Sequence, residues 1–313
     1  MSDSSGKPGG LCLVTGGGGF LGRHVVRRLL ADGARVRVLD RAAPPVAGGA
    51  DWVVGDLADP PVLARALDGV ADVVHLACTS VPKTSEADPA RDVAENVNGL
   101  VALLSECAAR RVRRFVLSSS GGTVYGVARQ LPTPETHPTA PISAHGAMKL
   151  AQEMYAGLFH RTRGLDVVIL RVANAYGPGQ NPDRPQGIAG VFLDRLMRGT
   201  PIRLEGRGET IRDFVHVDDI AAAFALAVRA AVRDPVFNIG TGRGTRVREV
   251  LEALERSTGR KTRVEDAPAN PFDVPASVLD AARAREQLGW HPSVPIEEGL
   301  ARLATAARTA RGG

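Results

Sequence analysis

The chain has little cysteine and very little lysine. Its three cysteines, Cys12, Cys78 and Cys107, are few and far apart among 313 residues, which excludes a disulfide framework. Cys12 and Cys107 fall within apolar patterns, where buried free thiols are expected. Only four of the 39 basic residues are lysine, so arginine carries almost all of the positive charge.

The arginines form one dense cluster, and this cluster does not indicate a nucleic-acid partner. It consists of Arg110, Arg111, Arg113 and Arg114, at the end of a predicted helix, where cations complement the helix dipole. The remaining basic residues are spread along the chain, and the net charge is only +5. We therefore expect no nucleic acid as a partner, and we predict no metal site.

Long hydrophobic runs are also absent. No apolar stretch approaches the roughly 20 residues needed to span a bilayer. The polar tail at residues 1–10, rich in Ser and Gly, lacks the apolar region of a signal peptide. We expect a disordered tail and a cytoplasmic protein without a membrane partner. Hydrophobic residues make up 44% of the chain and charged residues 23%, which suits a soluble protein with a buried core.

Short apolar segments alternate with helical patterns through residues 11–173. The segments expected as buried parallel strands are Leu11–Thr15, Arg35–Asp40, Val73–Leu76, Arg114–Ser118 and Val167–Arg171. Patterns with helical periodicity separate them at Leu21–Asp32, Pro60–Leu67, Arg91–Arg110 and Ala147–His160. This order predicts an α/β fold of the Rossmann type, a doubly wound parallel sheet with right-handed crossovers.

Residues 174–313 are less regular and are predicted to form mainly a smaller C-terminal substrate-binding lobe. Asn174–Gly190 is rich in Gly, Pro and Asn, which indicates a long loop. Shorter elements follow, with helices near Val191–Arg198, Ile220–Ala231 and Val247–Ser257 and strands near Arg212–Val217 and Val236–Ile239. We expect the lobe to close over the carboxyl ends of the strands, where open α/β sheets bind ligands, and part of the chain to return to the first domain.

A glycine-rich turn directly after the first predicted strand indicates a dinucleotide site. Gly16 permits a tight turn, Gly19 lets backbone amides approach a pyrophosphate, and Gly22 allows close packing of the helix on the strand. Phe20 and Leu21 begin that helix, so the phosphate charge would lie at its N-terminus.

The end of the second predicted strand bears on the choice between NAD and NADP. Asp40 stands where a carboxylate can accept hydrogen bonds from the adenosine ribose hydroxyls, and its charge opposes a 2′-phosphate. Arg41 follows at once and is able to pair with such a phosphate. The residues therefore favour NAD and leave NADP open.

Together with this turn, a segment near residue 145 resembles the extended short-chain dehydrogenase/reductases, of the NAD-dependent epimerase/dehydratase type. The active helix of that family carries Tyr-x-x-x-Lys, whereas this chain has His145 and Lys149 in the same spacing. The resemblance extends from Leu11 to about Gly299. It implies that Lys149 binds the nicotinamide ribose. For His145 it leaves open acid catalysis, a role in lining or orienting the pocket, or no role.

The resemblance also assigns the remaining cofactor and hydroxyl positions. Further cofactor contacts implied by it are Asp56, Leu57, Leu76, Ala77, Asn96 and Ser118. The family's catalytic hydroxyl falls on Gly121, counted back from the Val-Tyr-Gly turn, so the candidates left are Ser119, Ser120 and Thr123. Tyr125 of that turn is expected to be structural.

In the substrate lobe the resemblance is incomplete. Enzymes of the family that act on nucleotide sugars hold the diphosphate with an Asn and two Arg residues. Asn174 and Arg212 match the first two, but the third position is Asn270. Ser80 and Lys83 lie in a loop that borders the substrate in the family. Without the second guanidinium, Arg212 is either a phosphate ligand or a structural ion-pair residue.

Three functions are compatible with these residues. We favour an NAD(P)H-dependent ketoreductase acting on a small natural-product ketone, because reduction tolerates the loss of the Tyr and needs no diphosphate ligand. The lost Tyr also suggests a relation to the simocyclinone-type angucyclinone ketoreductase of antibiotic biosynthesis. The alternatives are a nucleotide-sugar 4-epimerase or dehydratase and a non-catalytic NAD(P)-binding protein. The resemblance further implies a homodimer formed through the helices at Arg91–Arg110 and Ala147–His160.

Overall fold

The predicted doubly wound parallel sheet is confirmed. The computed structural model describes residues 10–43, 48–180 and 187–312, so the expected disorder at residues 1–9 lies outside the described residues. Seven parallel strands form the main sheet in the order β11-β6-β5-β4-β1-β2-β3. Their bounds are β1 Leu11–Thr15, β2 Val36–Asp40, β3 Asp51–Val54, β4 Val70–His75, β5 Arg114–Ser120, β6 Val167–Val172 and β11 Val236–Ile239.

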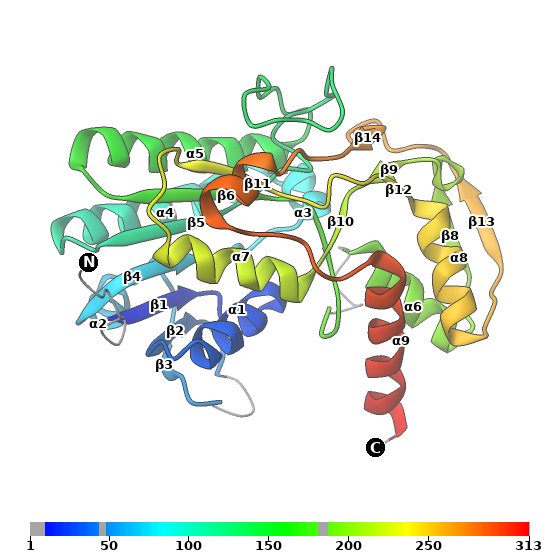
Figure 1. Cartoon of the computed structure of the whole chain (residues 1–313), viewed down its shortest axis with the longest axis horizontal. Coiled ribbons are helices and arrows are strands. Elements are labelled where there is room, and N and C mark those ends of the chain that lie inside the picture. The colour runs from blue at the N-terminus through cyan, green and yellow to red at the C-terminus, as the bar shows by residue number, and fades with distance from the viewer. Residues whose placement is uncertain (1–9, 44–47, 181–186, 313) are drawn as a thin grey trace.

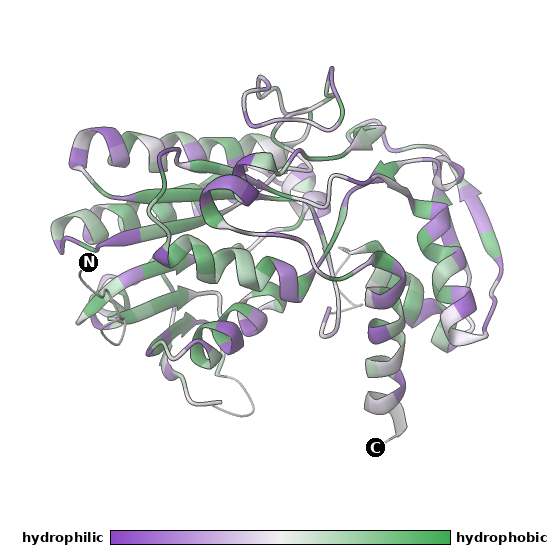
Figure 2. Ribbon diagram, in the orientation of Figure 1, coloured by the Kyte–Doolittle hydropathy of each residue, from purple (hydrophilic) through white to green (hydrophobic). Residues whose placement is uncertain are grey.

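Helices cover both faces of this sheet, as Figure 1 shows. They are α1 Phe20–Ala31, α2 Pro60–Ala66, α3 Pro82–Ala87, α4 Pro89–Ala109, α5 Ala144–Arg163 and α7 Val217–Arg229. Alternate residues of each strand enter different cores, so that Cys12 and Val14 pack with α1 and α7 whereas Leu13 packs with α4. Both faces are therefore buried, and the strands are coloured as nearly continuous apolar segments in Figure 2. Burial raises the pKa of the Cys12 thiol to about 12.

A smaller lobe lies beyond the carboxyl ends of the strands, on the right in Figure 1. Its elements are β7 Asn174–Tyr176, α6 Ile188–Arg198, β8 Ile202–Glu205, η1 Gly206–Gly208, β9 Ile211–Arg212, β10 Phe214–His216, β12 Thr245–Arg246, α8 Val247–Thr258, β13 Val264–Ala267, β14 Ala276–Ser277 and α9 Ile296–Gly312. The helices α6, α8 and α9 share a separate apolar core. No helix in the described part of the chain has both the length and the apolar character of a membrane span.

The C-terminal third of the chain also returns to the main sheet. The helix α7 packs on α1, and β11 adds an edge strand beside β6. The short π-helix η2 (Ala284–Leu288) follows, and the Trp290 side chain is buried in the same core as α1 and α7. The single strand expected at Arg212–Val217 is wrong in detail, because β9 and β10 belong to different small sheets, with Asp213 between them.

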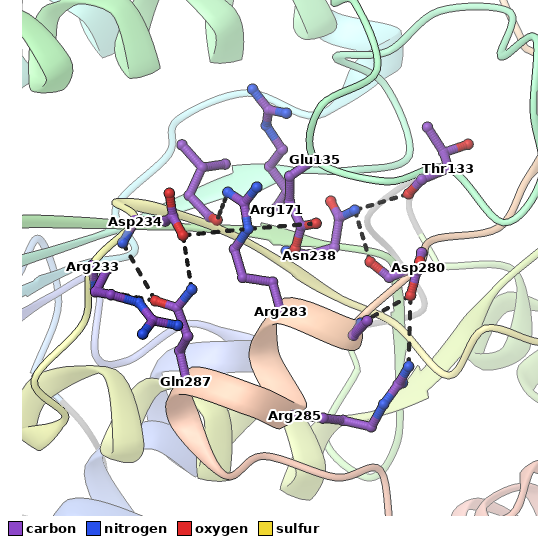
Figure 3. A network of polar contacts seen from close by, with 12 residues as sticks. Thr133, Glu135, Arg171, Arg233, Asp234, Asn238, Asp280, Arg283, Arg285 and Gln287 are labelled. Carbon is purple, nitrogen blue, oxygen red and sulfur yellow. Dashed lines mark hydrogen bonds and ion pairs between the residues drawn. The ribbon is translucent and has the colours of Figure 1, made fainter.

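A polar network fastens this returning segment to β11 (Figure 3). Asn238 donates to the carbonyl oxygens of Thr133, at 2.9 Å, and Asp280, at 3.0 Å. Gln287 donates to Asp234, at 2.7 Å, and Arg283 lies 3.9 Å from both Asp234 and Glu135. Because these contacts join the loop before α5 to the sheet edge, they also restrain the entry into α5.

A buried ion pair holds α5 itself against the sheet. Arg171 of β6 donates to both carboxylate oxygens of Glu153, with Nη2 to Oε2 at 2.6 Å and Nε to Oε1 at 3.0 Å. The side chains are 8% and 5% exposed. Ser119 donates to Glu153 at 2.5 Å, and Arg171 donates to Tyr125 Oη at 2.9 Å. The carboxylate and the guanidinium thus have several partners each, as a buried ion pair requires.

We expect Arg171→Leu to lower the free energy of unfolding by about 3–5 kcal/mol, because it leaves the Glu153 carboxylate buried without its counter-charge. Urea unfolding measures the loss. The control is Arg28→Gln, which removes an exposed i,i+4 pair with Asp32, and Asp32 keeps Arg229. That change should cost less than about 0.5 kcal/mol. Equal losses in the two variants would contradict the importance given to the buried pair.

Candidate active site

The glycine turn between β1 and α1 has the shape of a pyrophosphate cradle. Gly16 has a φ of +71°, and a Cβ there would lie 2.8 Å from the backbone of Ala77. A Cβ on Gly22 would lie 2.1 Å from the Gly16 carbonyl oxygen. Gly19 caps α1 without any side-chain hydrogen bond, so the first amides of α1, which include Phe20 and Leu21, are left for a ligand. These residues fit a dinucleotide.

Asp40 lies directly beside this turn. Its Oδ2 accepts a hydrogen bond from the Gly18 amide at 2.8 Å, which holds the carboxylate at the end of β2. Arg41, next in the chain, is exposed and instead pairs with Asp56 at 3.0 Å. The carboxylate therefore faces the cradle, whereas the guanidinium is engaged elsewhere.

The end of β4 forms the floor beneath the adenosine side of the cradle. Leu76 donates its amide to the Thr15 carbonyl at 3.1 Å, which fixes Leu76 and Ala77 below the turn. His75 Nδ1 lies 2.8 Å from Thr15 Oγ1, and burial together with Lys149 lowers the pKa of His75 to about 3. Leu57 packs against the core on the α4 side of the sheet. The floor is thus neutral and tightly packed.

Asn96 of α4 has all of its side-chain partners within the protein. Its Oδ1 accepts from the Thr79 amide at 2.9 Å, and its Nδ2 donates to Asp92 Oδ1 at 2.8 Å. It therefore shapes the 79–80 loop, whose Ser80 donates to Asp92 at 2.5 Å. The other residue predicted in this region, Lys83, is exposed in the first turn of α3.

Two buried side chains of α5, His145 and Lys149, stand one turn apart. Ser143 begins this helix by accepting from the Gly146 amide at 3.2 Å. Lys149 Nζ donates to the Ser118 carbonyl at 3.1 Å and to Gln152 Oε1 at 3.2 Å. The ammonium is thereby tied to the carboxyl end of β5, next to the cofactor cradle.

The three candidate hydroxyls separate into one structural residue and two available ones. Ser119 donates to Glu153 and belongs to the buried ion pair. Thr123 Oγ1 lies 3.4 Å from the Ser120 carbonyl, and no hydrogen bond of Ser120 Oγ occurs among the described residues. Gly121 faces the core, since a Cβ there would lie 2.4 Å from Leu279. Ser120 and Thr123 therefore remain as candidates for a substrate contact.

Tyr125 has a structural position. Its hydroxyl donates to Asn238 at 2.7 Å and accepts from Arg171, whose guanidinium also lies over the ring. It joins the α5 ion pair to the network at β11.

His145 is held as a neutral imidazole at neutral pH. Burial, and secondly the charge of Lys149, lower its pKa to about 4, while Asp92 acts in the opposite direction. The ring Nδ1 lies 3.5 Å from Ser85 Oγ. Depression by Lys149 was expected from the spacing, but burial is the larger cause. A neutral imidazole is able to accept a proton, which suits a base in the oxidation direction.

In the lobe, Asn174 reaches the site and Arg212 is held apart. A Cβ on Gly122 would lie 3.2 Å from Asn174 Oδ1, so that amide adjoins the end of β5. Arg212 is buried and donates to the Asp273 carboxylate and, at 2.8 Å, to the Val274 carbonyl. Asn270 accepts from the Phe272 amide at 3.0 Å. Arg212 has the partners of a structural ion pair here.

Two polar residues near His145 were missed in the sequence. Asp92 lies four residues before Asn96 on α4 and therefore on the same face. Ser85 of α3 contacts the imidazole, but the short helix α3 itself was not expected. The spacing from Asp92 to Asn96 was the available signal.

Comparison with known proteins agrees with this architecture. The model of the "NAD dependent epimerase/dehydratase family" matches residues 12–240. The chain belongs to this family. It is 36% identical over 300 residues to a UDP-glucose 4-epimerase of Mycolicibacterium smegmatis, covering 93% of this chain and 96% of that one. It is 31% identical over 308 residues to a dTDP-glucose 4,6-dehydratase of Streptomyces niveus, covering 92% and 90%.

Solved structures of the family superpose on nearly the whole chain. A UDP-glucose 4-epimerase of Thermotoga maritima with UDP-glucose is 38% identical with a TM-score of 0.91. A UDP-glucose 4-epimerase of Thermus thermophilus with NAD is 36% identical with a TM-score of 0.90. In both comparisons the alignment covers 96% of this chain and 99% of the other.

These findings correct the function favoured from the sequence. The ketoreductase interpretation is wrong, because the full-length relatives are UDP-glucose 4-epimerases and a dTDP-glucose 4,6-dehydratase. Two altered side chains, at positions 145 and 270, were given more weight than a scaffold that is shared along the whole chain. The relation to the simocyclinone-type ketoreductase is not confirmed by these matches.

We expect Gly22→Ala to weaken NAD binding at least tenfold, because its Cβ would collide with the Gly16 carbonyl and open the turn. Calorimetry with NAD measures the loss. Gly99→Ala is the control, since a Cβ there meets only Leu57 at 3.6 Å. Unchanged NAD affinity in Gly22→Ala would show that the cofactor does not depend on this turn.

Proposed function

We propose that the protein is an NAD-dependent enzyme that acts on a nucleotide-activated sugar, foremost a UDP-hexose 4-epimerase. The observation that carries this proposal is the likeness to UDP-glucose 4-epimerases, which extends over 96% of this chain and includes the lobe. A 4,6-dehydratase of a dTDP-sugar is the second candidate, favoured by the 31% identity to such an enzyme.

The cofactor of this proposal is NAD. The Asp40 carboxylate beside the turn suits free ribose hydroxyls and opposes a 2′-phosphate, and Arg41 is paired with Asp56. When bound, NAD would accept a hydride from the sugar carbon and return it. The glycine turn and the Leu76–Ala77 floor would hold the adenosine and pyrophosphate, and Lys149 the nicotinamide ribose.

His145 takes the role of base in this reaction. As hydride leaves the sugar carbon, the hydroxyl proton must go to a nearby acceptor, and the neutral imidazole is available for it. Its pKa lies below the ordinary value, so the base form is present at neutral pH and is lost as the pH falls through about 4. Ser120 or Thr123 would donate a hydrogen bond to the sugar oxygen, and Asn174 would contact the substrate from the lobe.

We expect the NAD-loaded protein to interconvert UDP-glucose and UDP-galactose, as followed by NMR of the anomeric protons. His145→Ala and Lys149→Met should each reduce the rate about 100-fold or more, because each removes a group at the reacting end of the site. Lys261→Met, which alters an exposed lysine of the lobe, serves as the matched control. Turnover of dTDP-glucose alone would favour the dehydratase, and no turnover of any nucleotide sugar would refute the proposal.

We further infer that two copies associate through α4 and α5. These helices pack side by side and leave apolar side chains exposed on their outer surface, namely Val93, Met154, Tyr155 and Leu158. Exposed apolar groups of this kind indicate an interaction surface. The resemblance to the family implies the same helices.

Light scattering should therefore give the mass of a dimer at micromolar concentration. Leu158→Glu should shift the protein to a monomer, because it places a charge in the apolar surface. Leu131→Glu, at an exposed loop position, should leave the mass unchanged. A monomeric wild-type protein would reject the association.

A further inference from the structure

One buried carboxylate next to the site is only half satisfied. Asp92 of α4 is 3% exposed. Its Oδ1 accepts from Ser80 Oγ at 2.5 Å and from Asn96 Nδ2 at 2.8 Å. Its Oδ2 is buried and has no hydrogen-bond partner among the described residues. Leaving such an oxygen without a donor is costly, so a specific reason for it is expected.

The position of Asp92 relates it to His145. The helix α4 packs along α5, and α3 packs against both, so that the three helices enclose the two side chains. Ser80, which donates to Asp92, and Ser85, whose Oγ lies 3.5 Å from His145 Nδ1, flank the start of α3. Asp92 and His145 are therefore connected through one short segment.

The charges around His145 come from each of the surrounding elements. Lys149, on α5 itself, disfavours the imidazolium, and so does burial. Glu86 of α3 accepts the Ala144 amide at 2.5 Å and is engaged at the N-terminus of α5. His75 at the end of β4 is neutral in the ordinary pH range. Asp92 is thus the carboxylate that favours the protonated ring.

We propose that Asp92 is the positioning residue that allows a histidine to replace the family's tyrosine, by stabilising the imidazolium of His145 while it holds the substrate proton. This inference rests on the proposed function. In the oxidation step the sugar O–H bond breaks, an N–H bond forms on His145, and the hydride passes to NAD as the carbonyl forms. The imidazolium would then stand beside the Lys149 ammonium, and the free Oδ2 of Asp92 supplies the compensating charge.

The same carboxylate would oppose a tyrosine at position 145. A phenol that gives up its proton becomes negative, and a nearby buried carboxylate raises the phenol pKa. A histidine that gains a proton becomes positive, and the carboxylate then favours the charged form. Asp92 is therefore matched to His145, and the effect of removing its charge should depend on which residue occupies position 145.

The first test measures protonation directly and requires no turnover. In the NAD-loaded protein with 13C-labelled histidine, Asp92→Asn should lower the His145 pKa by about one unit, so that the protonated fraction falls about tenfold at each pH where the fold persists. Asn keeps the shape, and its carbonyl oxygen still accepts from Ser80 and Asn96. Glu106→Gln, which removes a charge at the far end of α4, should leave His145 unchanged. An unchanged His145 in Asp92→Asn overturns the proposal, whether or not the protein acts on sugars.

The second test uses activity in two backgrounds. With His145 present, Asp92→Asn should lower kcat at least tenfold and move the acid limb of the pH profile to lower pH. In a His145→Tyr background, Asp92→Asn should cause no loss or a gain. Equal losses in both backgrounds would indicate a structural role, and a change in KM alone would indicate that Asp92 binds the sugar; either result overturns the proposal.

Discussion

The buried ion pair between Glu153 and Arg171 is the interaction on which the candidate site depends. It joins α5 to β6 through several hydrogen bonds, and both side chains are buried. Because α5 cannot shift without separating these charges, Lys149 is held at the carboxyl end of β5. The same pair engages Ser119 and Tyr125, which removes both hydroxyls from the chemistry.

Around this fixed helix the chain departs from its family at two positions, and each departure has a local partner. At position 145 a neutral, buried imidazole stands near Asp92, whose free oxygen suits a transient positive charge. At position 270 an asparagine caps its own turn, and Arg212 pairs with Asp273. The cofactor cradle and Lys149 are retained, so the departures concern the proton and the diphosphate rather than hydride transfer.

Much of the fold could be predicted because its determinants are local. The apolar strands, the glycine turn and the spacing of residues 145 and 149 are patterns within short segments. The division of residues 212–217 between β9 and β10, and the return of β11 to the sheet edge, depend on contacts between distant segments. The roles of Ser119 and Asp92 were hidden for the same reason, since their partners lie on other elements. The function was misjudged because two side chains were weighed against a scaffold whose similarity is spread over the whole chain.

The most direct test of the account is a single-turnover reduction of the bound cofactor. NAD-loaded protein would be mixed with UDP-glucose while the absorbance of reduced nicotinamide is followed. The account predicts that the reduced form appears, and that it appears much more slowly in His145→Ala. Formation of the reduced cofactor at the same rate without the imidazole would contradict the role of His145, and no reduction by any nucleotide sugar would contradict the proposed function.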